Sequence, residues 1–213
     1  MKKIAVIGAG GFGREVKMLI DQINDRQPAY EFLGYFDDGV EKGASVNGFP
    51  VLGGIDDLMA FPDIAIALAI GNPVTKEKIW QRIQHLPLER PVLSHPSVWI
   101  GKDEVTIGAG TLICAGCILT VNIEIGENVI LNLGCTVGHD TRIGDFSSFM
   151  PGINISGEVV IHPKVYVGTG AKIINQLEIG AGTIIGAGAV VSKTIPENCT
   201  AVGIPAKPIK FHN

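Results

Sequence analysis

The chain has 213 residues and a formal net charge of -4, so it lacks the basic excess that a nucleic-acid or anionic-membrane surface needs. Charged residues make up only 18% of the chain, while 28 residues are glycine. This composition favours a globular protein with many tight bends over a disordered one, and small molecules over nucleic acids as partners.

The N-terminal segment Met1–Gly8 has a charged start, but its apolar run stops after four residues at a glycine, so we do not interpret it as a signal peptide. No apolar stretch approaches the length of a membrane span, and we expect no membrane insertion. We therefore expect a cytoplasmic protein with its four cysteines reduced.

Residues 1–93 alternate short β-branched runs with helical stretches, which predicts a small α/β domain. About 90 residues suffice for one mononucleotide-binding βαβ unit, and the domain is therefore half-Rossmann-like. The expected strands are 3–7, 32–36, 64–70 and 92–93, and the expected helices are 12–24, 55–60 and 74–85, with an irregular link at 39–54.

Residues 94–213 follow a different period. In steps of six from Ile107, all fifteen first positions up to Val191 are apolar, and the fifth positions are small or branched. Second positions favour glycine, which we expect to permit the bends. The pattern predicts a left-handed parallel β-helix, a triangular prism with three hexads per coil, followed by a C-terminal tail. Residues 95–100 form a first coil that is offset by one residue.

Cys114 and Cys117 have the spacing of a redox motif or metal site. However, Cys117 and Cys135 fall in the inward fifth position, no second such pair exists, and no histidine lies at ligand spacing. We interpret the cysteines as core residues and expect no metal.

Across essentially its whole length the chain resembles the nucleotide-sugar and sialic-acid acetyltransferases of bacterial surface-glycan synthesis, which include bacillosamine and perosamine N-acetyltransferases. The matching segments are Gly8-Ala9-Gly10-Gly11-Phe12-Gly13, Phe36-Asp37-Asp38, Ala69-Ile70-Gly71-Asn72, Val137-Gly138-His139-Asp140 and Val202-Gly203-Ile204-Pro205-Ala206-Lys207. The resemblance implies an acyltransferase that uses acetyl-CoA to acetylate a nucleotide-activated amino sugar, such as a 4-amino-4,6-dideoxyhexose.

His139 falls on an outward corner of its hexad, where an imidazole has no core to fill. The neighbouring Asp140 carboxylate can fix the tautomer and raise the basicity of the imidazole, as a general base requires. On its own such a pair is often only a solvated corner. The resemblance places the catalytic base at His139, with Asp140 as its acidic neighbour.

The resemblance also implies that the backbone N–H of Gly157 faces a developing oxyanion, and that backbone groups near Thr169 and Ala187 meet the pantetheine arm of acetyl-CoA. Lys207 is a candidate phosphate contact or a solvated tail charge. Because an outward groove on one prism gains walls only from a neighbour, we expect a homotrimer with acetyl-CoA between subunits.

The glycine loop that contains Gly10, Gly11 and Gly13 follows a strand and opens a helix, and Asp37 follows at the end of the next expected strand. This arrangement suits a nucleotide-linked sugar. We expect Asp37, Asp38, Gly71 and Asn72 to lie beside the loop at the carboxyl ends of the strands. Many relatives have histidine where this chain has Phe12, so either a contact is absent or the acceptor sugar differs. Arg14 can supply phosphate-binding charge instead.

Three alternatives remain open. An O-acetyltransferase would act on sialic acid or another hydroxyl acceptor, and a non-catalytic β-helix would serve as a ligand-binding or scaffold protein. A nicotinamide-dependent enzyme would use the glycine loop, although residues 1–93 lack a second mononucleotide lobe.

Overall fold

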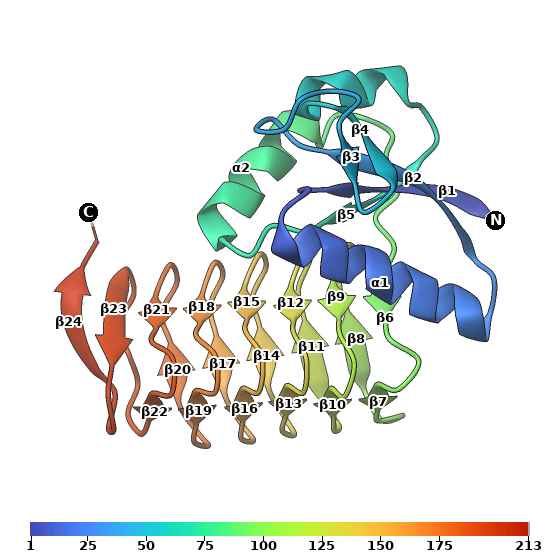
Figure 1. The fold of residues 1–213 in the computed structure, drawn as a ribbon. Helices are drawn as coiled ribbons and strands as arrows, with labels where there is room; N and C mark the ends of the chain where they lie inside the picture. Colours follow the sequence, from blue (N-terminus) through green and yellow to red (C-terminus); the bar gives the residue numbers. More distant parts are fainter. Residues whose placement is uncertain (213) are drawn as a thin grey trace.

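The repeat region folds into a triangular prism with one parallel sheet on each side (Figure 1). The structure is a computed structural model and describes residues 1–212, so residue 213 of the expected tail lies outside the described residues. Face I consists of β7 (Trp99–Ile100), β10 (Ile118–Leu119), β13 (Thr136–Val137), β16 (Asn154–Ile155), β19 (Lys172–Ile173) and β22 (Val190–Val191). Face II consists of β8 (Val105–Ile107), β11 (Ile123–Ile125), β14 (Arg142–Ile143), β17 (Val160–Ile161) and β20 (Glu178–Ile179).

Face III begins where the α/β half ends and carries the C-terminal hairpin. It consists of β6 (Leu93–Ser94), β9 (Leu112–Ile113), β12 (Ile130–Leu131), β15 (Ser148–Phe149), β18 (Tyr166–Val167), β21 (Ile184–Ile185), β23 (Cys199–Val202) and β24 (Lys207–Phe211). Among the described residues, only β24 runs antiparallel to its neighbour on this face. The chain passes from face III to face I to face II in each coil, which defines three edges: III–I, I–II and II–III.

The register confirms the six-residue repeat and the β-helix that it predicts. Leu131 pairs with Ile113 and with Phe149, which hold the same hexad position three hexads before and after it, so three hexads complete one coil. Ile100 pairs with Leu119, although it stands one position too early in the repeat, which confirms the offset of the first coil. First-position and fifth-position side chains fill one continuous apolar core through the prism, and their removal from water stabilises the stack.

The bends form at the fourth hexad position, where φ is positive on both of the edges that matter for the site. On edge III–I these residues are all glycine, with φ between 65° and 75°: Gly116, Gly134, Gly152, Gly170 and Gly188. On edge I–II they are polar, with φ between 50° and 59°: Glu104, Asn122, Asp140, Glu158 and Gln176. The prediction that second-position glycines permit the bends is wrong. They allow close stacking of coils instead, because a Cβ on Gly138 would lie 2.6 Å from the backbone nitrogen of Gly157.

The α/β half contains one sheet in the order β3-β4-β2-β1-β5. Its strands are β1 (Lys2–Ile7), β2 (Tyr30–Phe36), β3 (Ser45–Val46), β4 (Phe49–Gly53) and β5 (Ala65–Leu68), and its helices are α1 (Gly11–Arg26) and α2 (Pro73–Ile83). Strands β2, β1 and β5 are parallel, as the βαβ prediction requires.

Three local expectations in this half are corrected. The strand expected at 92–93 is β6, which pairs with β9 on face III of the β-helix and not with the α/β sheet. The link at 39–54 holds a hairpin, β3–β4, because Asn47 and Gly48 both have positive φ, the signature of a tight hairpin turn. The helix expected at 55–60 is a 3₁₀ helix, Ile55–Ala60, which is common for such short connections.

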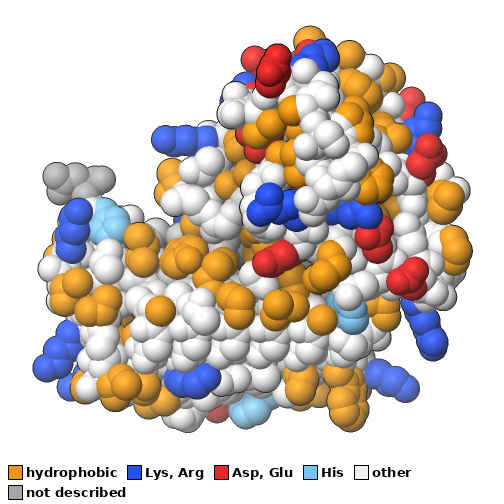
Figure 2. Space-filling view, viewed as in Figure 1, with side chains coloured by type: hydrophobic (Ala, Val, Ile, Leu, Met, Phe, Trp, Pro, Cys, Tyr) orange, Lys and Arg blue, Asp and Glu red, His pale blue; other side chains and the backbone are white. Residues whose placement is uncertain are grey.

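The two halves share apolar packing and specific polar contacts. Helix α1 buries Val16, Leu19 and Ile20 in a cluster that also contains outward-facing residues of face III. Helix α2 is anchored by Lys76, whose Nζ donates to Ser148 Oγ at 2.9 Å. The space-filling view shows a band of apolar surface along the β-helix below the α/β half (Figure 2). Within residues 1–212, no helix is long and apolar enough to cross a membrane.

Candidate active site

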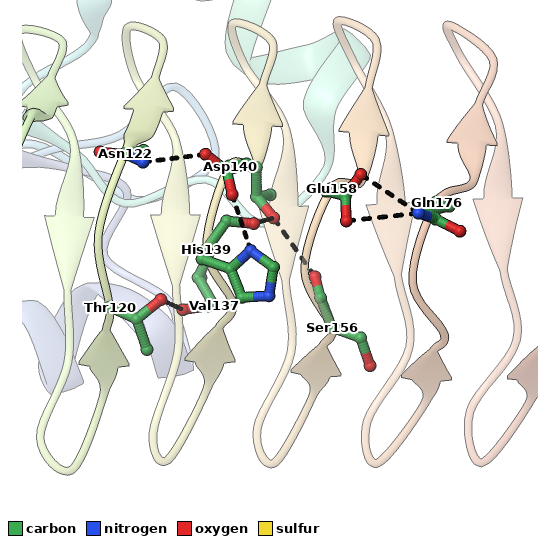
Figure 3. Close-up of polar contacts among 9 residues, drawn as sticks. Thr120, Asn122, Val137, His139, Asp140, Ser156, Glu158 and Gln176 are labelled. Carbon is green, nitrogen blue, oxygen red and sulfur yellow. Dashed lines mark hydrogen bonds and ion pairs between the residues drawn. The ribbon is translucent and has the colours of Figure 1, made fainter.

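His139 and Asp140 lie together on edge I–II, between β13 and β14 (Figure 3). The Nδ1 atom of His139 is 2.7 Å from Asp140 Oδ2, and both side chains are about half exposed. A carboxylate can only accept hydrogen bonds, so Nδ1 carries the proton and donates it. The unprotonated Nε2 is then available to accept a proton, which is the arrangement that a general base requires.

Asp140 is held by a second hydrogen bond, from a residue one coil earlier. The side-chain amide of Asn122 donates from Nδ2 to Asp140 Oδ1 at 2.9 Å. The hydrogen bonds from Asn122 and from His139 lower the pKa of Asp140 below its usual value. Asp140 is therefore a carboxylate at neutral pH and a constant acceptor for the imidazole.

Gly157 lies one coil above His139 at the same hexad position, directly against the imidazole ring. A Cβ on Gly157 would clash with His139 Nε2, so any larger residue would displace the ring. No residue in the range 1–212 accepts a hydrogen bond from the Gly157 backbone N–H. A free amide beside the base is suited to stabilise an oxyanion.

The glycine loop and Asp37 meet at the carboxyl ends of β1 and β2, as expected. Asp37 Oδ2 accepts a hydrogen bond from the Ala9 backbone N–H at 2.8 Å, which ties the loop to the neighbouring strand. A Cβ on Gly13 would clash with the Gly8 carbonyl oxygen, so close packing of helix and strand requires glycine there. Gly10 and Gly11 are exposed and have open space around them.

Asp38 does not join this loop. Its Oδ1 accepts a hydrogen bond from the Ile55 backbone N–H, and its Oδ2 pairs with Arg82 at 2.7 Å. The backbone hydrogen bond from Ile55 and the side-chain hydrogen bond from Arg82 lower the pKa of Asp38. These contacts leave the Asp38 carboxylate holding the 3₁₀ helix and α2 in place.

Gly71 and Asn72 line a cavity of about 460 Å³ between the start of α2 and face III. Asn72 Oδ1 caps α2 by accepting from the Thr75 backbone N–H at 2.9 Å. The opposite wall comes from the β-helix and the C-terminal end: Met150, Lys164, Tyr166, Gly182, Ile184 and His212. These wall residues are missed by sequence reasoning, since no local motif links them to α2.

Phe12 packs its ring against the apolar cluster of the α/β half, so it serves the fold of this domain. Arg14 is exposed one turn into α1. The side chain of Arg14 approaches the position of a Cβ on Gly11 at 4.0 Å, which places its charge beside the glycine loop.

Thr169 and Ala187 lie on edge III–I, one coil apart and both exposed. Lys207 is exposed at the start of β24. His139 lies on edge I–II, so face I separates it from Thr169 and Ala187 within one chain. The structure brings His139, Asp140 and Gly157 together. It leaves Thr169 and Ala187 on edge III–I and Lys207 on the C-terminal strand of face III.

The four cysteines are unpaired and buried in or against the apolar core. Burial raises the pKa of Cys114 to about 12, so it is a thiol at neutral pH. In the described part of the chain, no three histidine, cysteine or acidic side chains group as metal ligands would.

Asn122 is the site residue that sequence reasoning missed although the sequence contained a signal. It occupies the same hexad position as Asp140, one coil earlier, and in-register coils place such residues side by side. Once the repeat is known, this contact follows from numbering alone.

Two family models match the chain. Residues 3–83 match the model of the PglD N-terminal domain, and residues 158–193 match the bacterial transferase hexapeptide model, which describes six repeats. The chain thus combines a PglD-type α/β domain with a transferase β-helix.

One curated relative matches nearly the whole chain. GDP-perosamine N-acetyltransferase of Escherichia coli O157:H7 is 34% identical over 217 residues, covering 99% of this chain and 97% of the relative. The chain belongs to the family of hexapeptide-repeat acetyltransferases that includes this enzyme, and it is an acyltransferase.

Solved structures agree. The acetyltransferase domain of PglB from Neisseria gonorrhoeae FA1090, in complex with acetyl coenzyme A, is 34% identical with a TM-score of 0.87, covering 98% of this chain and 99% of that one. A mutant perosamine N-acetyltransferase from Caulobacter crescentus, with asparagine in place of a histidine, is solved in complex with CoA and GDP-perosamine. It is 27% identical with a TM-score of 0.87, covering 99% of this chain and 98% of that one.

Proposed function

We propose that the protein transfers the acetyl group of acetyl-CoA to the amine of a nucleotide-activated amino sugar, such as a 4-amino-4,6-dideoxyhexose, in bacterial surface-glycan synthesis. The observation that carries the proposal is the geometry of edge I–II. There the imidazole of His139, oriented by Asp140, presents a free Nε2 next to the free backbone N–H of Gly157. The complexes of the relatives with acetyl-CoA, and with CoA and GDP-perosamine, support the choice of both substrates.

In the proposed reaction the amine lone pair attacks the thioester carbonyl carbon. His139 Nε2 accepts the proton that the nitrogen loses, while the Gly157 N–H stabilises the negative charge on the carbonyl oxygen. The C–S bond then breaks, and the CoA thiolate leaves and is protonated. His139, Asp140 and Gly157 lie on one edge, so a single chain carries this part of the machinery.

We assign residues 1–93 to the nucleotide sugar and residues 94–213 to acetyl transfer. The loop of Gly10 and Gly11, with Phe12 and Gly13 at the start of α1, lies at the switch point where β1 separates β2 from β5. In open parallel sheets, ligands bind at such a point. Asp37 lies beside the loop, and Gly71 and Asn72 open the cavity that leads towards face III. Asp38 would contribute to this site only indirectly, by holding the 3₁₀ helix and α2 in place next to the sheet.

The active enzyme, in this proposal, is a homotrimer in the cytoplasm. Thr169 and Ala187 can reach a substrate at His139 only if edge III–I of one subunit faces edge I–II of the next. Contacts between two different surfaces close a ring, and three subunits form the smallest ring beyond a dimer. Trp99 is 74% exposed and Ile118 43% exposed on face I, between the two edges, and subunit contact would bury them. The four free thiols are consistent with a reducing compartment.

Lys207 is the proposed phosphate contact of acetyl-CoA, as an exposed cation near the end of the β-helix. On edge III–I, a Cβ on Gly134, Gly152, Gly170 or Gly188 would meet nothing within 4 Å, so the chain itself leaves room there. A pantetheine arm or a neighbouring backbone packed flush against this edge explains why all five positions are glycine.

Release of CoA thiol tests the proposal directly. Purified protein is incubated with acetyl-CoA and, separately, with a nucleotide-linked 4-amino-4,6-dideoxyhexose, the same free sugar, sialic acid and serine. We expect rapid release with the nucleotide amino sugar only, and an N-acetylated product by mass spectrometry. Release with sialic acid or serine alone would identify an O-acetyltransferase. No release from any acceptor, together with no thermal stabilisation by acetyl-CoA, would favour the scaffold interpretation.

A further inference from the structure

Five polar residues occupy the left-handed position of successive coils on edge I–II, beginning with Glu104. After Glu104 the series continues as a row of two carboxylates flanked by two amides, in the order Asn122, Asp140, Glu158 and Gln176 (Figure 3). Each amide binds one carboxylate: Asn122 donates to Asp140 at 2.9 Å, and Gln176 donates to both oxygens of Glu158 at 3.2 and 3.3 Å. The row is therefore divided into two amide–carboxylate pairs.

This division determines which groups hold Asp140. Glu158 turns towards Gln176, and the nearby Arg142 pairs with Glu124 at 3.5 Å. Among the described residues, Asn122 and His139 are the only side chains that bind the Asp140 carboxylate. Each takes a different oxygen, so Asn122 prevents the carboxylate from rotating away from the imidazole.

Asn122 is itself fixed by the backbone. Its N–H donates to the Asp103 carbonyl at 2.9 Å, and its φ of 56° is a conformation that asparagine tolerates better than most residues. Since Asp140 only accepts hydrogen bonds, the amide group must present its NH₂ side to it.

We propose that Asn122 is a positioning residue for the transfer reaction: its amide locks the Asp140 carboxylate in the rotamer that holds the His139 imidazole in the Nδ1–H tautomer. It touches no reacting atom and acts through Asp140. This inference rests on the proposed function, because it assigns Asn122 a role in the reaction of His139.

The charged groups around this pair set the expected pH behaviour. Glu104, Glu124, Arg142 and Glu158 surround a hollow of about 350 Å³ on the face II side of Asp140. Without the Asn122 amide the Asp140 carboxylate can rotate away from the imidazole and stabilise an imidazolium less. In Asn122→Gly the acid limb of the kcat/KM profile should then move to lower pH, since a protonated base is inactive.

Four variants test the proposal in matched pairs. Asn122→Gly removes the amide in a residue suited to positive φ, and Asn122→Asp replaces it with a carboxylate. Gln176→Gly and Gln176→Glu make the same changes in the other pair of the row. We expect both Asn122 variants to lower kcat about tenfold with KM for acetyl-CoA unchanged, because only orientation is lost. The acid limb should move to lower pH in Asn122→Gly, whereas the added negative charge of Asn122→Asp should move it to higher pH.

The Gln176 variants should stay within about twofold of the wild type in kcat and keep its pH profile, since they do not touch the Asp140–His139 pair. Wild-type kcat and pH profile in Asn122→Gly, or an equal loss in Gln176→Gly, would overturn the proposal. Melting temperatures of all four variants separate lost activity from lost folding.

A second measurement does not depend on turnover. The ¹⁵N chemical shifts of histidine report the tautomer, and His139→Gln identifies the relevant signal. Wild-type protein should show His139 with its proton on Nδ1, and Asn122→Gly should show a tautomer mixture. An unchanged tautomer would contradict the role of Asn122, whereas a changed tautomer without thiol release in the wild type would contradict only the proposed function.

Discussion

Edges I–II and III–I of the β-helix share a backbone conformation but carry opposite side chains. At the left-handed position, edge I–II has Glu104, Asn122, Asp140, Glu158 and Gln176, while edge III–I has five glycines. Their φ values lie in the same left-handed region, between 50° and 59° on the polar edge and between 65° and 75° on the glycine edge. Backbone geometry therefore does not explain the difference between them.

The comparison shows that the coil requires a left-handed backbone conformation at each corner but does not determine the residue type there. We infer that function determines the residue type. Asparagine and aspartate tolerate this conformation, and even glutamate and glutamine occupy it on edge I–II, so glycine is not obligatory for the turn. We infer that edge I–II keeps Asn122 and Asp140 because they orient His139. We also infer that edge III–I has only glycine because a ligand or a neighbouring subunit would occupy the space.

The largest expected effect comes from removing the base. His139→Ala should lower kcat by about two to four powers of ten, the usual contribution of a general base. The side chain is half exposed and outside the core, so the melting temperature should barely change. Thiol release and thermal melting measure the two quantities. A kcat of His139→Ala close to that of the wild type would show that edge I–II does not carry the catalytic base.

The next largest effect should come from Gly157→Ala. The new methyl group would clash with His139 Nε2, so the exposed ring must move. A shift of about 1 Å at a reacting group can cost about a hundredfold in rate, and we expect such a loss in kcat. The control is Asn175→Ala, at the same hexad position one coil further on. Equal activity of Gly157→Ala and wild type would show that His139 does not act from this position.

A smaller, more selective effect is expected on the glycine edge. Gly170→Asn adds a side chain into open space in a residue that tolerates the φ of 73°, so the single chain should still fold. If edge III–I faces acetyl-CoA or a neighbouring subunit, KM for acetyl-CoA should rise about tenfold, or the trimer should weaken.

Steady-state kinetics and analytical ultracentrifugation distinguish these results. The matched control is Gln176→Asn on edge I–II, which keeps a polar side chain at the equivalent corner. If Gly170→Asn behaves like wild type in both measurements, neither acetyl-CoA nor a neighbouring subunit contacts edge III–I at this coil.

The smallest expected effect is on the pH dependence of stability. It comes from Lys76, which joins the α/β half to face III of the β-helix. Burial without a carboxylate partner lowers the pKa of Lys76 well below its usual value. The folded state then binds fewer protons than the unfolded state below the unfolded pKa of about 10.4, so stability rises with pH towards that value.

Lys76→Met removes this titration. Wild-type protein should therefore gain stability relative to Lys76→Met between pH 7 and pH 10, as measured by urea unfolding at each pH. Parallel stability curves for the two proteins would mean that Lys76 does not lose its proton on folding.

Much of the fold follows from sequence pattern, because the β-helix repeats one local rule. Each first-position residue from Ile113 to Val191 is buried, and each coil pairs with the next in register. The α/β half is harder to predict at its irregular parts. The Asn47-Gly48 turn carries a recognised hairpin signal inside the segment expected as an irregular link, and Ile55–Ala60 has too few residues to distinguish 3₁₀ from α geometry.

In the candidate site, too, local contacts could be predicted from the sequence and long-range contacts could not. The contact of His139 with Asp140 is between sequence neighbours, and the position of Gly157 follows from the repeat. The sequence predicts Asp38 beside the nucleotide loop, but its bonds to Ile55 and Arg82 depend on how α2 packs, which is a long-range contact. The cavity between α2 and face III likewise depends on the docking of the two halves.

The sequence by itself determined the prism, its core columns and the outward position of His139, because each depends on hydrophobic burial with a period of six residues. The repeat also places Asn122 beside Asp140 and Gly157 beside His139, one coil apart. Only the tertiary structure decided the hydrogen bonds that hold Asp140, how closely Gly157 approaches the imidazole, and where Lys76 anchors α2. These depend on side-chain rotamers and on the docking of the two halves, which the repeat does not specify.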